Sequence, residues 1–281
     1  MNVEKKEIQM NGMTYTVREA GMDNHGELVI LLHGFPECSI IWEKTMDKLS
    51  DMGYRCLAPD QRGYSEGARP DGYEAYAVNI LAEDVVSFAE NAGSDRQFHL
   101  VGHDFGAVVG WTTVAMHPEL IKSWTALSVP YWPAYYWAIN NDPEQQQKGA
   151  YVKHFQEPGL PEKMLAANDY AILKKLWDWF DDRTVNEYMG IFKTAGALTA
   201  AVNWYRALFS VNTGIDYHDV TTPTLFIWGN QDLAIGRAGV EKNHSYMKGD
   251  YEFKELNAGH WLMEFNEAEV SELIINEIKN H

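Results

Sequence analysis

The sequence predicts an α/β fold, in which a mostly parallel β-sheet is flanked by helices. Three short, mostly apolar segments occupy residues 27–35, 54–60 and 97–103, and each closes in a turn. Such runs are typical of strands that are buried on both faces of a sheet. Between the second and third runs, apolar side chains recur on one predicted helix face: Ala77, Leu81, Val85 and Phe88. Strands and helices that alternate in this way indicate a parallel sheet.

The same pattern extends toward both ends of the chain. Residues 13–19 alternate apolar and polar side chains, which predicts a half-exposed antiparallel strand. Residues 223–229 and 251–256 predict two more strands. The last helix is expected to bury a stripe made of Val270, Leu273, Ile274 and Ile278. In the helix that contains Leu81, we expect Glu83, Asp84 and Glu90 to lie on the exposed side.

The middle of the chain differs from both ends. Residues 130–217 contain no comparable apolar strand, but they carry aromatic-rich, helix-like stretches and five of the ten tryptophans. We therefore predict a core formed by residues 1–129 and 218–281, with a helical cap inserted at 130–217. The alternative is one more helical layer packed on the same sheet.

Composition excludes several classes of function. The chain has 281 residues with 23 Lys plus Arg against 40 Asp plus Glu, a net charge of −17. This charge disfavours nucleic-acid and anionic-membrane partners, which bind through basic side chains. Cys38 and Cys56 form no C-x-x-C pair, so no cysteine-based metal or redox site is expected. The first twenty residues lack an apolar signal segment, which predicts a cytoplasmic protein. The sequence leaves open whether the chain forms a homodimer.

The most informative motif is Gly-His-Asp-Phe-Gly at residues 102–106. It follows a predicted buried strand and opens a helix of small residues, the setting of a G-x-nucleophile-x-G elbow. The central residue is Asp104, which is already anionic at neutral pH and needs no base for attack. A carboxylate suits displacement at saturated carbon, which gives an ester that water must then hydrolyse with the help of a base.

A base and its partner follow later predicted strands. His260 lies in the turn after the last strand, and Asp232 lies just past the preceding one. The order Asp104, Asp232, His260 is that of nucleophile, acid and histidine in the α/β-hydrolase fold. After the first buried run comes His33-Gly34-Phe35-Pro36. We expect the backbone N–H groups of Phe35 and Phe105 to form an oxyanion hole for the Asp104 carbonyl.

These motifs resemble the α/β-hydrolase superfamily, and within it the epoxide hydrolases with their haloalkane dehalogenase relatives. The resemblance rests on HGFPE at 33–37, DQRGYS at 60–65, GHDFG at 102–106 and AGHW at 258–261, and it covers the whole chain. It implies a hydrolase that uses no cofactor and no metal. It further implies that a small or medium apolar epoxide is opened to a vicinal diol through a covalent aspartyl ester.

The resemblance also assigns proton donors in the cap. Epoxide hydrolases supply two cap tyrosines to the epoxide oxygen, and Tyr151 and Tyr205 are similar in position and context. The expected catalytic set is thus Asp104, Asp232, His260, Tyr151 and Tyr205. The expected substrate pocket includes Phe35, Phe105, Trp204 and Trp261.

Two other functions stay open. Haloalkane dehalogenases resemble this chain but carry Trp after the nucleophile and commonly Asn after the first His-Gly, where this chain has Phe105 and Phe35. Haloacid (fluoroacetate) dehalogenases carry Arg after the nucleophile, and this chain has none between Asp104 and Trp111. The second alternative is a non-catalytic fold of the same kind that binds a small molecule.

Overall fold

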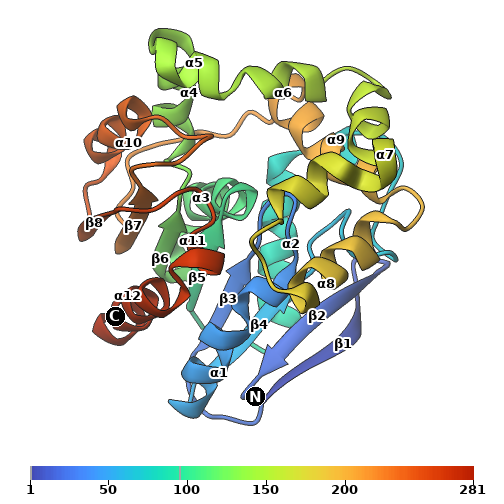
Figure 1. The fold of residues 1–281 in the computed structure, drawn as a ribbon. Helices are drawn as coiled ribbons and strands as arrows, with labels where there is room; N and C mark the ends of the chain where they lie inside the picture. The colour runs from blue at the N-terminus through green and yellow to red at the C-terminus, as the bar shows by residue number, and fades with distance from the viewer. Residues whose placement is uncertain (1, 95) are drawn as a thin grey trace.

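A twisted sheet of eight strands forms the centre of the computed structural model, which describes residues 2–94 and 96–281 (Figure 1). Its strand order is β1-β2-β4-β3-β5-β6-β7-β8. The pairs β1–β2 and β2–β4 are antiparallel, and the pairs from β4–β3 through β7–β8 are parallel. The strands are β1 Val3–Met10, β2 Met13–Ala20, β3 Leu28–Leu32, β4 Arg55–Pro59, β5 Phe98–His103, β6 Ile121–Leu127, β7 Thr224–Gly229 and β8 Tyr251–Leu256. The predicted α/β class is confirmed.

Helices cover both faces of this sheet. The helices α1 and α12 pack together on one face, and α2 and α3 pack together on the other. The α-helices are α1 Glu43–Asp51, α2 Val78–Asn91, α3 Phe105–Met116, α4 Trp132–Asn141, α5 Pro143–Lys148, α6 Ala150–Phe155, α7 Leu160–Leu176, α8 Asp182–Phe192, α9 Ala197–Ser210, α10 Arg237–Asn243, α11 Leu262–Phe265 and α12 Glu267–Asn280. The β3, β5 and β7 strands are buried along their whole length, because helices cover both of their sides.

The helices from α4 to α9 all lie between β6 and β7 in the sequence and cross over one end of the sheet (Figure 1). The aromatic-rich stretches predicted to be helical within residues 130–217 lie at 131–137, 175–180 and 202–209. The first and third lie almost wholly in α4 and α9. The stretch 175–180 departs from the helical expectation, because α7 ends at Leu176 and residues 177–179 form turns. Trp177 nevertheless stays fully buried against Tyr188 and Phe192, so packing and not helicity accounts for its aromatic character.

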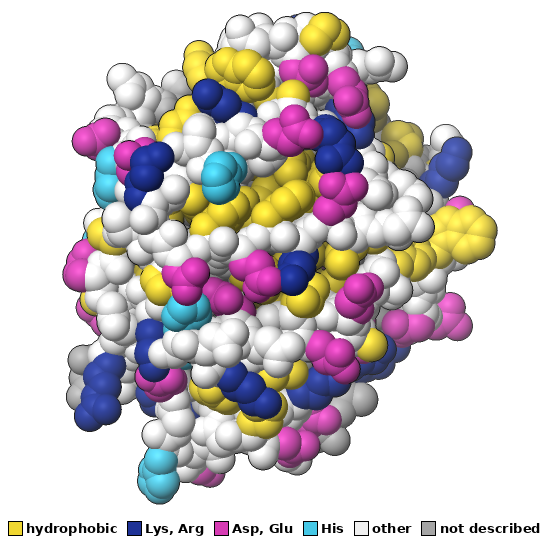
Figure 2. Space-filling model, turned by 90° about the vertical axis from the view of Figure 1, so that its left-hand side faces the viewer, with side chains coloured by type: hydrophobic (Ala, Val, Ile, Leu, Met, Phe, Trp, Pro, Cys, Tyr) yellow, Lys and Arg dark blue, Asp and Glu magenta, His cyan; other side chains and the backbone are white. Residues whose placement is uncertain are grey.

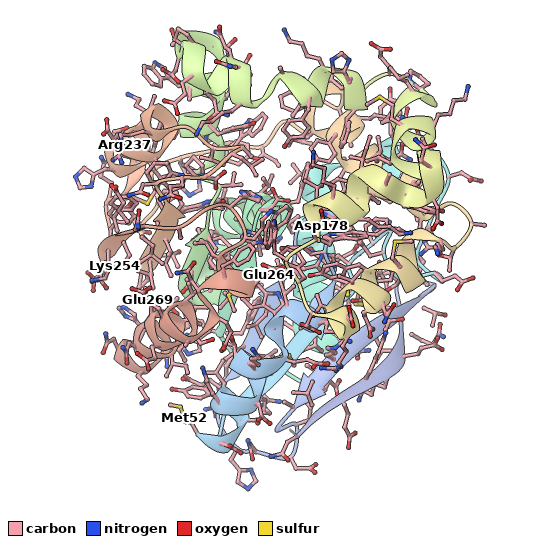
Figure 3. The ribbon with its side chains drawn as sticks, in the orientation of Figure 1. Met52, Asp178, Arg237, Lys254, Glu264 and Glu269 are labelled. Atoms are coloured by element: carbon pink, nitrogen blue, oxygen red, sulfur yellow. The ribbon has the colours of Figure 1, made fainter. Side chains whose placement is uncertain are left out.

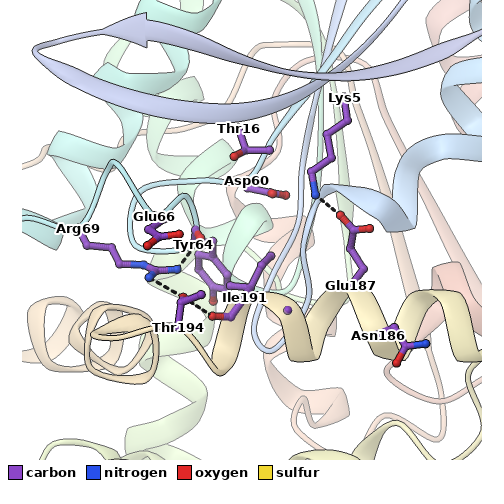
Figure 4. Close-up of a pocket in the computed structure, with 11 residues that line it drawn as sticks. Lys5, Thr16, Asp60, Tyr64, Glu66, Arg69, Asn186, Glu187, Ile191 and Thr194 are labelled. Atoms are coloured by element: carbon purple, nitrogen blue, oxygen red, sulfur yellow. Dashed lines mark hydrogen bonds and ion pairs between the residues drawn. The ribbon is translucent and has the colours of Figure 1, made fainter.

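Polar contacts connect helix α8 to strands β1 and β2. Glu187 of α8 pairs with Lys5 of β1 and with Arg18 of β2, and its distance to Arg18 is 2.9 Å. On the same side, Arg69 donates to Thr194 at 2.7 Å. Figure 4 shows Lys5, Glu187, Arg69 and Thr194 around a polar cleft between the first two strands and α8. This cleft is separate from the cleft above Asp104.

One expectation for helix α2 is wrong. Asp84 is buried and not exposed, because its carboxylate receives two hydrogen bonds of 2.7 Å from the Arg62 guanidinium and one of 3.1 Å from the Tyr15 hydroxyl. A buried carboxylate is stable where charged and neutral donors satisfy it in this way. The sequence pattern places Asp84 on a polar face but does not reveal that Arg62 and Tyr15 lie opposite it.

The surface is mixed in character. Figure 2 shows one face on which acidic, basic and hydrophobic side chains are interspersed. In the part of the chain that the structure covers, no helix is both long and apolar enough to cross a membrane. Cys38 and Cys56 are both free and buried, as expected for small apolar side chains.

Candidate active site

Asp104 occupies a sharp turn between β5 and α3. Its φ and ψ angles are 51° and −118°, a conformation that L-residues rarely adopt and that stores backbone strain. The turn requires its two glycines. A Cβ atom on Gly102 would lie 2.4 Å from the Gly106 carbonyl oxygen, and one on Gly106 would lie 2.2 Å from the Leu32 carbonyl oxygen. The glycines of the motif therefore let the helix start directly against the neighbouring strand.

The Asp104 carboxylate faces donors from two other loops. Its Oδ1 atom accepts the backbone N–H of Phe35 at 2.8 Å, and its Oδ2 atom lies 3.4 Å from Nε2 of His260. The N–H of Phe105 is at the first position of α3, where a helix has no acceptor of its own. Gly34 makes the close approach possible, because a Cβ there would lie 2.4 Å from Oδ1 of Asp104.

His260 is held from its other side by a carboxylate and a hydroxyl. Nδ1 of His260 lies 2.9 Å from Oδ2 of Asp232 and 2.9 Å from the Ser128 hydroxyl. Ser128 also donates to Asp232 at 2.5 Å. The other oxygen of Asp232 accepts the backbone N–H groups of Ala234 and Ile235 at 2.7 and 2.9 Å. The carboxylate that orients the imidazole is thus fully hydrogen-bonded.

The electrostatics of the site favour a charged imidazole. Burial alone would lower the pKa of His260, but the Asp232 charge and the hydrogen bond that Asp104 accepts from the imidazole raise it well above its usual range. Burial works against the charged form of Asp232 as well, and the His260 charge and hydrogen bonds outweigh it, so the pKa of Asp232 is lowered. In the resting protein, His260 is therefore a cation between two carboxylates.

Two tyrosines of the α4–α9 segment line the Asp104 cleft. Tyr151 of α6 and Tyr205 of α9 lie with their ring centroids 6.1 Å apart and their hydroxyls within hydrogen-bonding reach of each other. Tyr205 is buried, whereas part of Tyr151 is exposed. Desolvation, followed by a neighbouring tyrosine and then by the Asp104 charge, raises the pKa of both phenols, so each keeps its proton as a hydrogen-bond donor. The ring of Tyr205 packs edge-on against Phe35 and Phe105 at centroid distances of 5.6 and 4.6 Å, which fixes its direction.

The four expected pocket residues take different positions. Phe105 lines the cleft above Asp104 together with both tyrosines. Phe35 borders it with its N–H and packs its ring on Tyr205. Trp204 lies behind Phe105 and donates its indole N–H to the Arg62 carbonyl at 2.9 Å. Trp261 packs on His260 at 4.9 Å and does not line the described part of the cleft.

Sequence reasoning missed three contributors to this site. Ser128 follows β6 directly, and its place at the carboxyl end of a central strand is the one signal that could have identified it. Tyr135 of α4 lines the Asp104 cleft beside the two predicted phenols. His103 and Glu37 form a buried 2.9 Å pair behind the triad.

The described geometry defines an α/β-hydrolase, and comparison with known proteins agrees. Residues 27–267 match the family model described as the alpha/beta hydrolase fold, so the chain belongs to this family. The chain is 33% identical to the AB hydrolase superfamily protein YfhM of Bacillus subtilis, with 97% of both chains covered.

Within that class, the chain belongs to the epoxide hydrolase family. It is 31% identical to epoxide hydrolase 3 of Xenopus tropicalis, covering 92% of this chain and 73% of the relative. The crystal structure of the Bacillus megaterium epoxide hydrolase with an inhibitor matches with a TM-score of 0.88 at 25% identity, covering 98% of this chain and 100% of that one. The predicted family is confirmed, and the protein is a hydrolase.

Proposed function

We propose that this protein opens apolar epoxides to vicinal diols through a covalent ester on Asp104. The observation that carries the proposal is the position of the Asp104 carboxylate, between the Phe35 N–H and His260 and below the paired hydroxyls of Tyr151 and Tyr205. A hydroxyl nucleophile would need a base in the first step, whereas a carboxylate nucleophile needs none. Residues 130–217, which carry both tyrosines, act in this proposal as the cap.

In the first step, Asp104 attacks a carbon of the epoxide ring. The new C–O bond joins that carbon to Oδ2 or Oδ1, and the ring C–O bond breaks with its electron pair going to oxygen. Tyr151 and Tyr205 donate hydrogen bonds to this developing alkoxide, and one of them gives it a proton. A dry, aromatic cleft favours this transfer, because water there would compete for the same donors.

In the second step, His260 removes a proton from water, and the resulting hydroxide attacks the ester carbonyl carbon of Asp104. The N–H groups of Phe35 and Phe105 receive the negative charge on the carbonyl oxygen. The ester bond then breaks, the leaving oxygen takes the proton held by His260, and the diol departs. The carboxylic acid formed at Asp104 gives up its proton, which restores the tyrosine that donated one in the first step. Ester formation has removed the Asp104 charge, which is one of the two that raise the pKa of His260, so the imidazole becomes a better base once the ester exists.

The two-step scheme is tested by His260→Gln. We expect this variant to form the ester and fail to hydrolyse it, so intact-protein mass spectrometry after incubation with styrene oxide shows the added mass of one substrate. Peptide mapping should place it on Asp104. His244→Gln, which changes an exposed histidine, is the matched control and should show no stable adduct. The absence of an adduct in His260→Gln, with turnover in the wild-type protein, would contradict covalent catalysis.

Assays of the wild-type protein distinguish epoxide hydrolysis from the dehalogenase and binding-protein alternatives that the sequence left open. A panel of epoxides and organohalides is scored for diol and for halide release together. Diol formation supports the proposal. Halide release without diol formation would indicate a dehalogenase, and tight binding of unchanged ligand would indicate a non-catalytic binding protein.

A further inference from the structure

Two carboxyl groups approach each other close to His260. Glu37 is fully buried in the loop after β3, and Glu264 is partly buried in α11, four residues after His260. Oε1 of Glu37 and Oε2 of Glu264 are both buried, and no N–H or hydroxyl of the described residues donates to either of them. The two carboxyl groups lie within hydrogen-bonding reach of each other. Since two carboxylate oxygens are both acceptors, this contact needs one proton between them.

The remaining oxygens of the pair are occupied by donors. Oε2 of Glu37 accepts the backbone N–H of Gly34 at 3.1 Å and lies 2.9 Å from Nδ1 of His103. Oε1 of Glu264 accepts the Tyr188 hydroxyl at 3.2 Å. Glu37 therefore meets the His103 ring and a backbone N–H, whereas Glu264 meets only neutral donors, the Tyr188 hydroxyl and its own backbone N–H. This difference in donors favours the charge on Glu37 and the proton on Glu264.

The imidazole of His103 connects this pair to the base. Its Nδ1 faces the Glu37 carboxylate, and its Nε2 lies 2.9 Å from the backbone carbonyl oxygen of His260. Both neighbours are acceptors, so both ring nitrogens donate and His103 is a cation. One positive imidazole and two carboxyl groups that share one proton together carry no net charge, which suits a buried cluster.

We propose that Glu264 carries this proton and acts as a positioning residue for His260. The proton lets α11 pack against Glu37, which in turn holds the Gly34–Phe35 loop through the Gly34 N–H and the His260 backbone through His103. Loss of the proton would place two carboxylates against each other and separate α11 from this loop. The functional part of this inference rests on the proposed role of His260 in ester hydrolysis.

The surrounding charges agree with this assignment. Burial and the Glu37 charge raise the pKa of Glu264 well above its usual range. For Glu37, burial is outweighed by the charge and hydrogen bond of His103, which hold its pKa at about 2. Burial likewise opposes a charged His103, but Glu37 raises its pKa.

Other charged groups near Glu264 are paired elsewhere. The surface pocket that borders Glu264 also contains Glu43, Lys44, Asp181, Arg183 and Glu267. Glu43 binds Arg183 at 2.6 Å, Glu267 binds Lys48 at 2.9 Å with Lys44 at 3.8 Å, and Asp181 caps Thr184 at 3.0 Å. Across the described chain, no Lys or Arg forms an ion pair with Glu264, so no nearby cation stabilises its ionised form.

The first test is infrared spectroscopy of the wild-type protein and two variants at neutral pH. We expect a protonated-carboxyl C=O band in the wild type that loses intensity in Glu264→Gln; a residual band is expected from Glu277, whose pKa burial raises to about 7. Glu269→Gln is the control, because Glu269 is exposed on α12 (Figure 3). A wild-type spectrum without the band, or a band of unchanged intensity in Glu264→Gln, would overturn the assignment of the proton. The wild-type spectrum needs no variant, and neither result depends on epoxide turnover.

The second test compares stability across pH. Between the ordinary carboxyl pKa and the raised one, the folded wild type holds a proton that the unfolded chain has released, so its stability falls as pH rises. In Glu264→Gln this proton is absent. The ratio of the folding equilibrium constant of Glu264→Gln to that of the wild type should therefore rise about tenfold per pH unit between these two pKa values. Glu269→Gln should show no such trend, and an equally flat ratio for Glu264→Gln would contradict the proposal.

The positioning role has a separate kinetic readout. Glu264→Gln keeps a side-chain N–H that can donate to Glu37, whereas Glu264→Ala removes the donor. We expect Glu264→Ala to slow ester hydrolysis more than ester formation, and Glu264→Gln to restore hydrolysis. Equal rates of ester hydrolysis in Glu264→Ala and Glu264→Gln would contradict the positioning role. If neither the wild type nor the variants form an ester, the proposed function fails, while the infrared and stability results still decide the proton.

Discussion

The backbone N–H of Phe35 donates to Oδ1 of Asp104 at 2.8 Å, so the donor that the proposed mechanism assigns to the ester carbonyl already binds the proposed nucleophile in the resting protein. One N–H can serve both proposed steps, because Oδ1 stays bonded to the Asp104 Cγ and becomes the carbonyl oxygen when Oδ2 attacks the substrate. Gly34 permits this contact, since a Cβ there would lie 2.4 Å from both Cβ and Oδ1 of Asp104.

The first prediction concerns Gly34. Gly34→Ala should slow ester hydrolysis by on the order of 10²–10³-fold, the cost of removing one donor from the oxyanion hole that serves this step. Gly259→Ala is the control, because a Cβ at Gly259 meets no atom within 4 Å although it adjoins His260. Single-turnover kinetics measure the activity of both variants, and circular dichroism checks that both are folded. Equal activity in the two variants would contradict the assigned contact.

The phenols are tested by replacing both with phenylalanine. Tyr151→Phe with Tyr205→Phe removes the donors to the alkoxide and should slow ring opening on the order of 10²–10³-fold. Tyr73→Phe changes an exposed tyrosine and should behave as wild type. Rapid-quench measurement of ester formation gives the result. An unchanged rate in the double variant would remove the phenols from the mechanism.

Ser128→Ala tests the hydroxyl that sequence reasoning missed. Removing a hydrogen bond to a buried charge costs about 1.5–3 kcal/mol, so ester hydrolysis should slow by roughly ten- to a hundredfold. Ester formation should change less, because Asp104 does not contact Ser128 in the hydrogen bonds described above. Ser210→Ala, at the exposed end of α9, is the control. Equal slowing of both steps would show that the substitution acts through general disruption.

The two steps should respond differently to pH. His260 is charged in the resting protein because Asp232 and Asp104 raise its pKa above the usual range. Only the neutral imidazole can take a proton from water, so ester hydrolysis should accelerate as pH rises through the His260 titration in the ester. Ester formation needs no neutral imidazole, so ester should accumulate as pH is lowered. Quenched mass spectrometry across pH measures this, and a pH-independent ester fraction would contradict His260 as the base.

A stability prediction follows from the contact between α3 and β6. A Cβ on Gly110 would lie 2.0 Å from the Trp124 ring, so Gly110→Ala should destabilise the protein by about 1–3 kcal/mol through overpacking. Gly190 in α8 is also helical, but nothing lies within 4 Å of its Cβ position. Gly190→Ala should stabilise by about 0.5–1 kcal/mol, because alanine favours helix. Urea unfolding separates the two, and similar shifts would contradict the packing argument.

Buried parallel strands were predictable from sequence because their apolar runs differ from everything around them. β1 was not expected, since Lys5, Lys6 and Glu7 give it a polar edge-strand character. The sharp turn at Asp104 was predictable because Gly102 and Gly106 flank it between an apolar strand and a helix of small residues. The roles of Ser128 and Glu264 were not predictable, because they depend on segments that are distant in the sequence and meet only in the folded protein. A serine after a strand and a glutamate in a short helix carry no signal by themselves.

The α4–α9 segment leaves the sheet and returns to it close to the proposed triad. Ser128 precedes the exit by a few residues, and Asp232 follows the return through β7, while both phenols lie within the inserted segment. In the proposed mechanism, the atoms that form and break the ester therefore belong to one part of the chain, and the groups that protonate the leaving oxygen belong to another. Replacing residues 130–217 with the corresponding segment of a relative would change which substrates are accepted, while the residues proposed to form and break the ester would stay the same.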